Sequence, residues 1–325
     1  MLQILYVTFP FFALVLAGYA AARRGFLPLA AIPGLNGFVL YFALPCMLYR
    51  FGSSTPIAQL LDGAVFGVYL LCALVMVGFA ICMTLSARVD WNNASFGALV
   101  AAFPNTGFMG IPLLVALLGP RAAGPAIITI VVDLVITTSL CIALSRLGSG
   151  QGAGKGSASQ AAKNALKGVA SNPMPWAILS GALVSWLQFK LPQPVTQTVG
   201  LLADSASPVA LFTIGAVLAR SQMMASSGHA PAVPVMDYVP VALMKLVLHP
   251  LLVLLVGSAA ISLGLPLDRF ALVVIVLVAA LPSASNVSLL AEKFDANNGR
   301  IARIILVSTV LAFFSFAGVV KLVAR

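Results

Sequence analysis

The sequence is poor in charged residues. Only 8% of its 325 residues are Asp, Glu, Lys or Arg, and 61% are hydrophobic, whereas about 25% of the residues in soluble proteins are charged. A soluble globule cannot keep so much apolar surface out of water, and a disordered chain needs the opposite composition. The shortage of charge therefore excludes both classes and predicts a polytopic membrane protein.

The residue types used in catalytic and metal sites are also scarce. There are two His and four Cys; the cysteines lack C-x-x-C spacing, and neither His-Glu-x-x-His nor Gly-x-Ser-x-Gly occurs. We predict no enzyme activity, no metal site and no cofactor except a coupling H⁺ or Na⁺. The eighteen Lys and Arg against eight acidic residues fit cytoplasmic loops and lipid headgroups, so no nucleic-acid partner is expected.

Apolar stretches that could cross a bilayer recur along the whole chain. A spanning helix needs about 20 such residues. The fold class predicted is an all-α polytopic membrane protein with ten transmembrane helices. The expected spans lie near 2–22, 34–51, 62–86, 93–118, 122–146, 173–189, 197–219, 239–264, 268–291 and 299–323.

The basic residues predict the orientation of these spans. Arg23 and Arg24 follow the first apolar run instead of preceding it, which is typical of a retained helix with its amino end outside and not of a signal peptide. In that orientation six Lys or Arg fall outside and Lys245 falls within a span. Eleven fall inside: Arg23, Arg24, Arg88, Arg146, Lys155, Lys163, Lys167, Arg220, Lys293, Arg300 and Arg303. The positive-inside rule thus predicts an inner (plasma) membrane protein with both termini outside.

The chain contains an internal repeat. At an offset of 163 residues, Pro and Gly positions of the first two spans fall on those of spans six and seven; at an offset of 178, the segment 99–104 falls on 277–282. The predicted domains are a first repeat, a Gly- and Ser-rich cytoplasmic linker and a second repeat, over 1–146, 147–171 and 172–325. Five spans is an odd number, so the copies are expected to be inverted, as in secondary transporters.

Two spans at matching positions of the repeats carry helix-breaking residues. Proline removes a backbone donor and clashes with the preceding turn, so spans four and nine are expected to break and to expose free N–H and carbonyl groups near the midplane. Asn105 and Asn286 add amides that can bind a carboxylate or a cation. The alternative is that these residues only kink and pack the helices. The candidate substrate-binding residues are Pro104, Asn105, Thr106, Gly107, Pro282, Ser283, Ser285 and Asn286.

Ionisable residues occur inside the predicted spans, among them Asp133, Lys245 and His249. Burying a charge in lipid is costly, so Asp133 in span five and Lys245 in span eight are candidates for coupling. They could instead pair with each other or with carbonyls and only stabilise the core. His249 could relay protons or simply pack.

Several segments resemble the auxin efflux carrier family. The most specific of them is Asn105–Pro112. The others cover nearly the whole chain in the family's order: Leu44-Pro45, Pro208 with Gly215, Lys245 with Pro250, and Pro282–Asn286. The family includes plant auxin exporters and bacterial malonate or malate permeases, and it shares its fold with bile acid:sodium symporters. The resemblance implies a scaffold of helices 1, 2, 6 and 7 and a moving core of helices 3–5 and 8–10, in which helices 4 and 9 cross at Pro104, Asn105, Pro282 and Asn286.

The resemblance implies a secondary transporter of small organic anions that works by elevator-type alternating access. Malonate, malate and auxin-like acids are the expected substrates. Since this chain lacks the long central loop of the plant carriers, and Ser283–Asn286 differs from their Asn-Val-Pro, a small carboxylate is favoured over auxin itself. Helices 2 and 7 would form a homodimer contact. The alternative reading is an anion channel or uniporter driven by membrane potential alone, because broken helices can also line a pore.

Overall fold

The protein is helical throughout the part that the structure describes. The structure is a computed structural model, and it describes residues 2–55, 61–147, 173–226 and 233–323. In these residues, extended backbone pairs only at one isolated antiparallel bridge, between Pro104 and Ser283. The predicted linker 147–171 lies, apart from Leu147, outside the described residues.

Among the described residues, six helical segments are long and apolar enough to cross a membrane, which fits the predicted polytopic membrane protein. Four shorter apolar helices, Phe9–Arg23, Thr106–Leu118, Trp176–Trp186 and Arg269–Ala279, lie within the remaining predicted spans. The total of ten spans, their inversion and their sidedness stay predictions. The six long segments are Leu29–Ser54, Gly63–Thr84, Pro120–Arg146, Gln193–Met224, Val235–Ser262 and Asn298–Val323.

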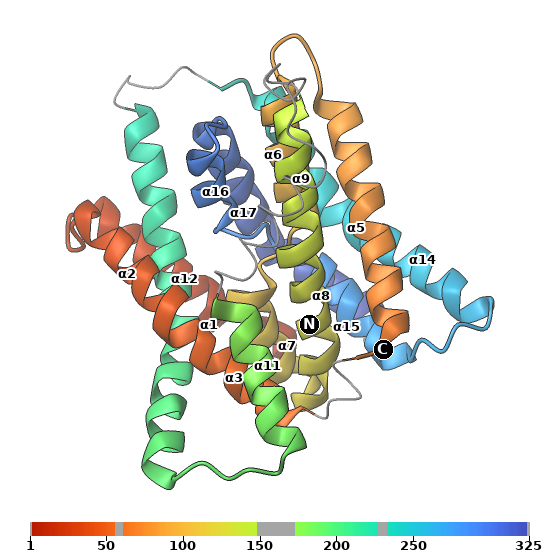
Figure 1. The fold of residues 1–325 in the computed structure, drawn as a ribbon. Coiled ribbons are helices and arrows are strands. Elements are labelled where there is room, and N and C mark those ends of the chain that lie inside the picture. The colour runs from red at the N-terminus through yellow and green to blue at the C-terminus, as the bar shows by residue number, and fades with distance from the viewer. Residues whose placement is uncertain (1, 56–60, 148–172, 227–232, 324–325) are drawn as a thin grey trace, which may run out of the picture. The chain divides into compact units, whose positions relative to one another are not determined.

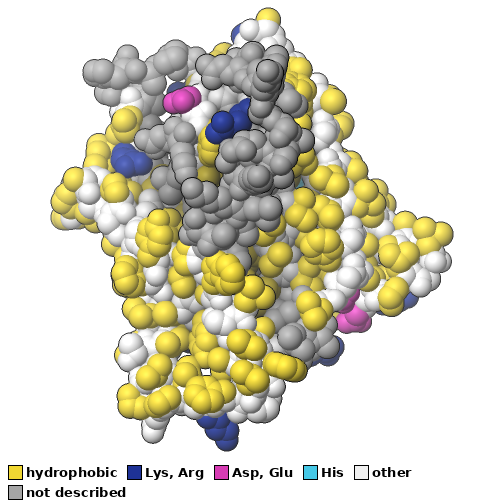
Figure 2. All heavy atoms as spheres, in the orientation of Figure 1, with side chains coloured by type: hydrophobic (Ala, Val, Ile, Leu, Met, Phe, Trp, Pro, Cys, Tyr) yellow, Lys and Arg dark blue, Asp and Glu magenta, His cyan; other side chains and the backbone are white. Residues whose placement is uncertain are grey.

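The surface has the composition expected of a protein bathed in lipid. Figure 2 shows hydrophobic side chains over most of the described part of one face, with few charged ones. Large apolar side chains such as Phe26, Leu201 and Phe314 are more than two-thirds exposed. Exposure of this kind is unfavourable in water and neutral in a bilayer.

The described chain forms two compact units that interleave along the sequence. The first comprises 1–62, 107–127 and 172–230. In it α1 packs on α12, and α3 packs on both α11 and α12 (Figure 1). Its elements are α1 (Leu2–Arg23), η1 (Leu29–Ala31), α2 (Ile32–Phe38), η2 (Val39–Ala43), α3 (Leu44–Ser54), α7 (Ile111–Leu118), η4 (Pro120–Ala122), α11 (Pro173–Trp186) and α12 (Gln193–Ser226).

Close helix contacts in this first unit depend on four glycines. A Cβ added to Gly18 would overlap the Phe212 carbonyl, and one on Gly215 would overlap backbone of α1. Gly52 of α3 and Gly181 of α11 approach the opposite backbone in the same way. Small residues allow such close packing in membranes, where the hydrophobic effect does not hold helices together.

The second compact unit comprises the described residues within 63–106, 128–171 and 231–325. Within it α6 packs on α5, α9 and α17, while α14 packs on α5 and α15. Its elements are α5 (Gly63–Thr84), α6 (Trp91–Ala102), η5 (Val132–Thr137), α9 (Thr138–Leu147), η7 (Val235–Asp237), α13 (Val239–Leu243), η8 (Met244–Leu248), α14 (His249–Ser262), α15 (Arg269–Ala279), α16 (Val287–Lys293) and α17 (Asn298–Val323). Two elements, η3 (Thr106–Gly110) and α8 (Ala123–Val131), cross from one unit to the other.

Candidate functional site

Both predicted interruptions occur, and each lies next to its proline. The helix α6 ends at Ala102, two residues before Pro104, and α15 ends at Ala279, three residues before Pro282. Because proline has no N–H and its ring clashes with the preceding turn, neither helix can continue regularly through these positions. Helical structure resumes after each break.

The two interruptions pair with each other through their backbones. The N–H of Asn105 donates to the Pro282 carbonyl at 2.8 Å. A second bond runs the other way, from the N–H of Ala284 to the Phe103 carbonyl at 2.9 Å. These two bonds satisfy backbone groups that an interrupted helix leaves open, which is a requirement for irregular backbone at membrane depth. The second compact unit therefore contains a crossing of two broken helices.

Most of the predicted site residues lie at this crossing and are buried. Asn105 is 4% exposed, Thr106 0% and Ser283 1%. The Ser283 N–H donates to Ser308 Oγ at 3.2 Å, and the Ser283 hydroxyl has no hydrogen-bond partner among the described residues. The crossing thus presents an uncommitted buried hydroxyl, that of Ser283.

The remaining predicted residues follow the crossing along the chain. Ser285 and Asn286 are half-buried and lead into α16, where the Ser285 carbonyl accepts from Ser288 Oγ at 2.9 Å. Gly107 belongs to the first compact unit. In the described part of the chain no hydrogen bond joins the side chains of Asn105 and Asn286. The structure thus joins Asn105 to Pro282 by a backbone hydrogen bond, but within the residues it describes it shows no hydrogen bond between the side-chain amides of Asn105 and Asn286.

Asp133 lies at the centre of a second buried polar cluster. Its carboxylate, 0% exposed, accepts from the Tyr69 hydroxyl at 3.0 Å and from Thr137 Oγ1 at 3.3 Å. It lies on the π-helical turn η5, whose widened backbone lets the Thr138 hydroxyl reach the Asp133 carbonyl at 2.7 Å. Such turns recur at functional sites.

Lys245 is buried in the same unit and is bound to the end of a broken helix. Its Nζ donates to the Ala279 carbonyl at 2.5 Å and lies 3.3 Å from His249 Nδ1. The His249 ring faces Tyr69, with centroids 6.0 Å apart. The carbonyl contact is one that the stabilising alternative predicts, and no ion pair joins Asp133 to Lys245 among the described residues.

We expect the Asp133→Ala variant to be less stable than the wild type. It leaves the buried Tyr69 hydroxyl without its acceptor, which costs about 1–3 kcal/mol of unfolding free energy. Thermal unfolding in detergent measures the loss. Asp204→Ala is the matched control, because Asp204 is exposed and its ion pair with Arg50 is worth at most about 1 kcal/mol. Equal midpoints for the two variants would contradict this role of Asp133.

Sequence reasoning missed two contributors to these clusters, Tyr69 and Ser308, and a further buried charge, Arg300. Tyr69 and Ser308 lie within long apolar runs and carry no local signal. Arg300 was counted as a loop charge, but it is 2% exposed within α17. Its Nε donates to the Asp237 carbonyl and its guanidinium to the Asn93 carbonyl, each at 2.7 Å. The position of Arg300 inside the predicted span 299–323 is the signal that could have found it.

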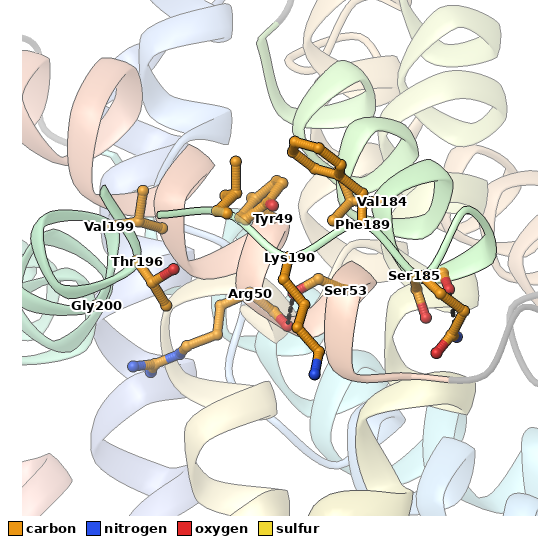
Figure 3. A pocket seen from close by; sticks show the side chains of 12 residues that line it. Tyr49, Arg50, Ser53, Val184, Ser185, Phe189, Lys190, Thr196, Val199 and Gly200 are labelled. Atoms are coloured by element: carbon orange, nitrogen blue, oxygen red, sulfur yellow. Dashed lines mark hydrogen bonds between the residues drawn. The ribbon is translucent and has the colours of Figure 1, made fainter. Parts of the chain in front are cut away.

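A separate pocket of about 310 Å³ lies in the first compact unit. Figure 3 shows Arg50 and Lys190 extending toward the same side of it. Arg50 is held by Asp204 at 2.6 Å. The pocket contains none of the predicted substrate residues, so it is not the candidate site. Its lining is Tyr49, Arg50, Ser53, Val184, Ser185, Gln188, Phe189, Lys190, Leu191, Thr196, Val199 and Gly200.

Known proteins resemble this chain over almost its full length. A family model described as "Membrane transport protein" matches residues 4–320. The "Putative malonate transporter" of Rhizobium meliloti is 30% identical over 328 residues, covering 99% of this chain and 97% of the relative. The "Uncharacterized transporter YfdV" of Escherichia coli is 28% identical over 291 residues, covering 88% and 87%. An "Uncharacterized transporter" of Methanothermobacter thermautotrophicus is 25% identical over 304 residues, covering 93% and 92%.

Proposed function

Because the chain belongs to the membrane transport protein family, the auxin efflux carrier family expected from its sequence, we propose that it is a secondary transporter of small organic anions. The substrates we propose are carboxylates such as malonate or malate, or auxin-like acids. The family and the relatives are transporters. The protein is accordingly a multi-pass membrane protein, for which we propose the inner membrane, with both termini outside.

The observation that carries this proposal is the crossing of the two interrupted helices. It gathers buried amide, hydroxyl and backbone groups at one place in the second compact unit. In inverted-repeat transporters the substrate lies where discontinuous helices meet near the midplane. The same arrangement here supports a binding site at Asn105, Thr106, Ser283 and the adjoining Asn286.

The chemistry of these groups fits a carboxylate. The Asn amides and the Ser hydroxyls are hydrogen-bond donors, and hydrogen bonds to a charged acceptor are about twice as strong as neutral ones. The relative at 30% identity bears the name of malonate in its description. These two observations favour a small mono- or dicarboxylate over a neutral solute.

The division into two compact units supports alternating access by movement of one unit against the other. One unit contains α1, α3, α11 and α12, and the other contains the crossing. We propose that the unit with the crossing carries the substrate, with coupling to H⁺ or Na⁺ through Asp133 or Lys245. A homodimer through the second and seventh predicted spans, 34–51 and 197–219, would hold the first unit still.

The second candidate is an anion channel or a uniporter driven by membrane potential alone, since interrupted helices also line pores. The two functions differ in how the transport rate depends on the substrate gradient. A carrier occludes its substrate and its rate saturates, whereas a channel conducts in proportion to the gradient. Counterflow of labelled substrate in proteoliposomes therefore separates a carrier from a channel.

We expect malonate to raise the thermal midpoint of the purified protein. A ligand that binds only the folded state at a hundred times its Kd adds about 2.7 kcal/mol of stability. The measurement compares malonate, malate and indole-3-acetate, each with and without Na⁺ and at two pH values. Malonamide, which has the same size and no charge, is the matched control. A shift with malonamide equal to that with malonate would overturn the proposal of an anion site.

A further inference from the structure

The carboxyl end of α15 has an acceptor that its own helix does not use. In a continuous helix the Ala279 carbonyl would accept from the N–H of Ser283. That N–H donates to Ser308 Oγ instead, at 3.2 Å. The Ala279 carbonyl is thereby left at the negative end of the helix dipole, where a cation is favoured.

A lysine side chain fills this position. Lys245 Nζ lies 2.5 Å from the Ala279 carbonyl oxygen, and the lysine is 0% exposed. It lies on the π-helical turn η8 between α13 and α14, with His249 Nδ1 at 3.3 Å. Among the described residues no carboxylate oxygen lies within 4.0 Å of Nζ. The ammonium is thus bound by a helix end and an imidazole, and not by a salt bridge.

The same helix ends bind free cations in other transporters. In inverted-repeat carriers, the carboxyl ends of half-helices and unwound carbonyls coordinate Na⁺. An ammonium at the end of a lysine side chain gives the carbonyl the same positive charge. Unlike Na⁺, however, it is covalently attached and does not leave in the transport cycle.

We propose that Lys245 is a built-in cation that takes the place of a coupling Na⁺ at the carboxyl end of α15. The carrier would then bind no Na⁺ at this position, which narrows the two coupling ions proposed above to H⁺, so that transport needs no Na⁺. This inference rests on the proposed function for its role in transport, but the binding claim stands on geometry alone. It also gives a role to a buried lysine that has no carboxylate oxygen within 4.0 Å among the described residues, in a position where an uncompensated charge is costly.

The test is the response of the thermal midpoint to cations in the absence of substrate. Wild type, Lys245→Ala and Lys245→Met are compared in the chlorides of Na⁺, NH₄⁺ and N-methylglucammonium at equal ionic strength. We expect no cation-specific shift for the wild type. The alanine variant leaves room for a free cation, so Na⁺ or NH₄⁺ should raise its midpoint by at least about 2 °C over N-methylglucammonium. The methionine variant fills that room and should not respond.

Lys321→Ala is the matched control, because Lys321 is an exposed lysine of α17 and its variant should behave like wild type. A Na⁺-specific rise in the wild type would overturn the inference, and this arm is decisive even if the Lys245 variants fail to fold. An alanine variant that folds and ignores every cation would overturn it too.

Transport gives an independent readout in proteoliposomes. Wild-type uptake of a carboxylate should be unchanged when Na⁺ is replaced by N-methylglucammonium. In N-methylglucammonium, uptake by Lys245→Ala should be at least about tenfold slower than uptake by the wild type. Na⁺ or NH₄⁺ should make uptake by this variant faster again. Wild-type uptake that stops without Na⁺ would overturn the inference. If no carboxylate is transported but the midpoints respond as expected, the proposed function fails and the cation role of Lys245 stands.

Discussion

The Asn105→Ala variant is expected to lose carboxylate transport while remaining folded. The Asn105 side chain is 4% exposed at the crossing, and its own backbone N–H already binds the Pro282 carbonyl. Removing the amide therefore leaves the crossing intact but removes a donor to the substrate. A hydrogen bond to a charged group contributes about 1.5–3 kcal/mol, so transport at low substrate concentration should fall by about tenfold to a hundredfold.

Initial uptake rates at several malonate concentrations measure this loss in proteoliposomes. The thermal midpoint and the elution profile of the purified variant show whether it is folded. Asn36→Ala is the matched control, since Asn36 is a half-buried asparagine of α2 in the other compact unit. Full transport by a folded Asn105→Ala protein would remove Asn105 from the proposed site.

The places where the helices break could be predicted from the sequence, but their pairing could not. Pro104 and Pro282 act locally, because each lacks an N–H and excludes a regular helix around itself. The contact between the Asn105 N–H and the Pro282 carbonyl joins residues far apart in the chain. Its register depends on how α6, α15 and α17 pack, which no local pattern specifies.

The hydrogen-bond partners of the buried polar groups also could not be predicted from local sequence patterns. Asp133 and Lys245 stood out because charges are rare in spans. Tyr69 is one aromatic among many in apolar runs, and only the packing of α5 brings its hydroxyl to Asp133 at 3.0 Å. The carbonyl that Lys245 binds becomes available only because α15 ends at Ala279. The ionisable residues were therefore predictable, and their partners were not.

We expect Gly215→Ala to destabilise the protein strongly. The new Cβ would overlap the Val15 carbonyl oxygen and lie 2.7 Å from the Tyr19 nitrogen. These are backbone atoms of α1, so no side chain can rotate away and the two helices must separate. Overpacking typically costs about 1–3 kcal/mol, and a rigid backbone contact belongs at or above the upper end. Thermal unfolding and the yield of monodisperse protein measure the effect.

Gly200→Ala on the same helix α12 is the control, because a Cβ there meets nothing within 4 Å. Alanine is the better helix former by about 1 kcal/mol, so this variant should be neutral or more stable. Gly18→Ala tests the same contact from the α1 side, where the Cβ would overlap the Phe212 carbonyl. If one methyl already forces α1 and α12 apart, the second finds space, and the double variant should lose less than the sum of the two single losses. Strict additivity would mean that the two glycines do not share one close helix contact.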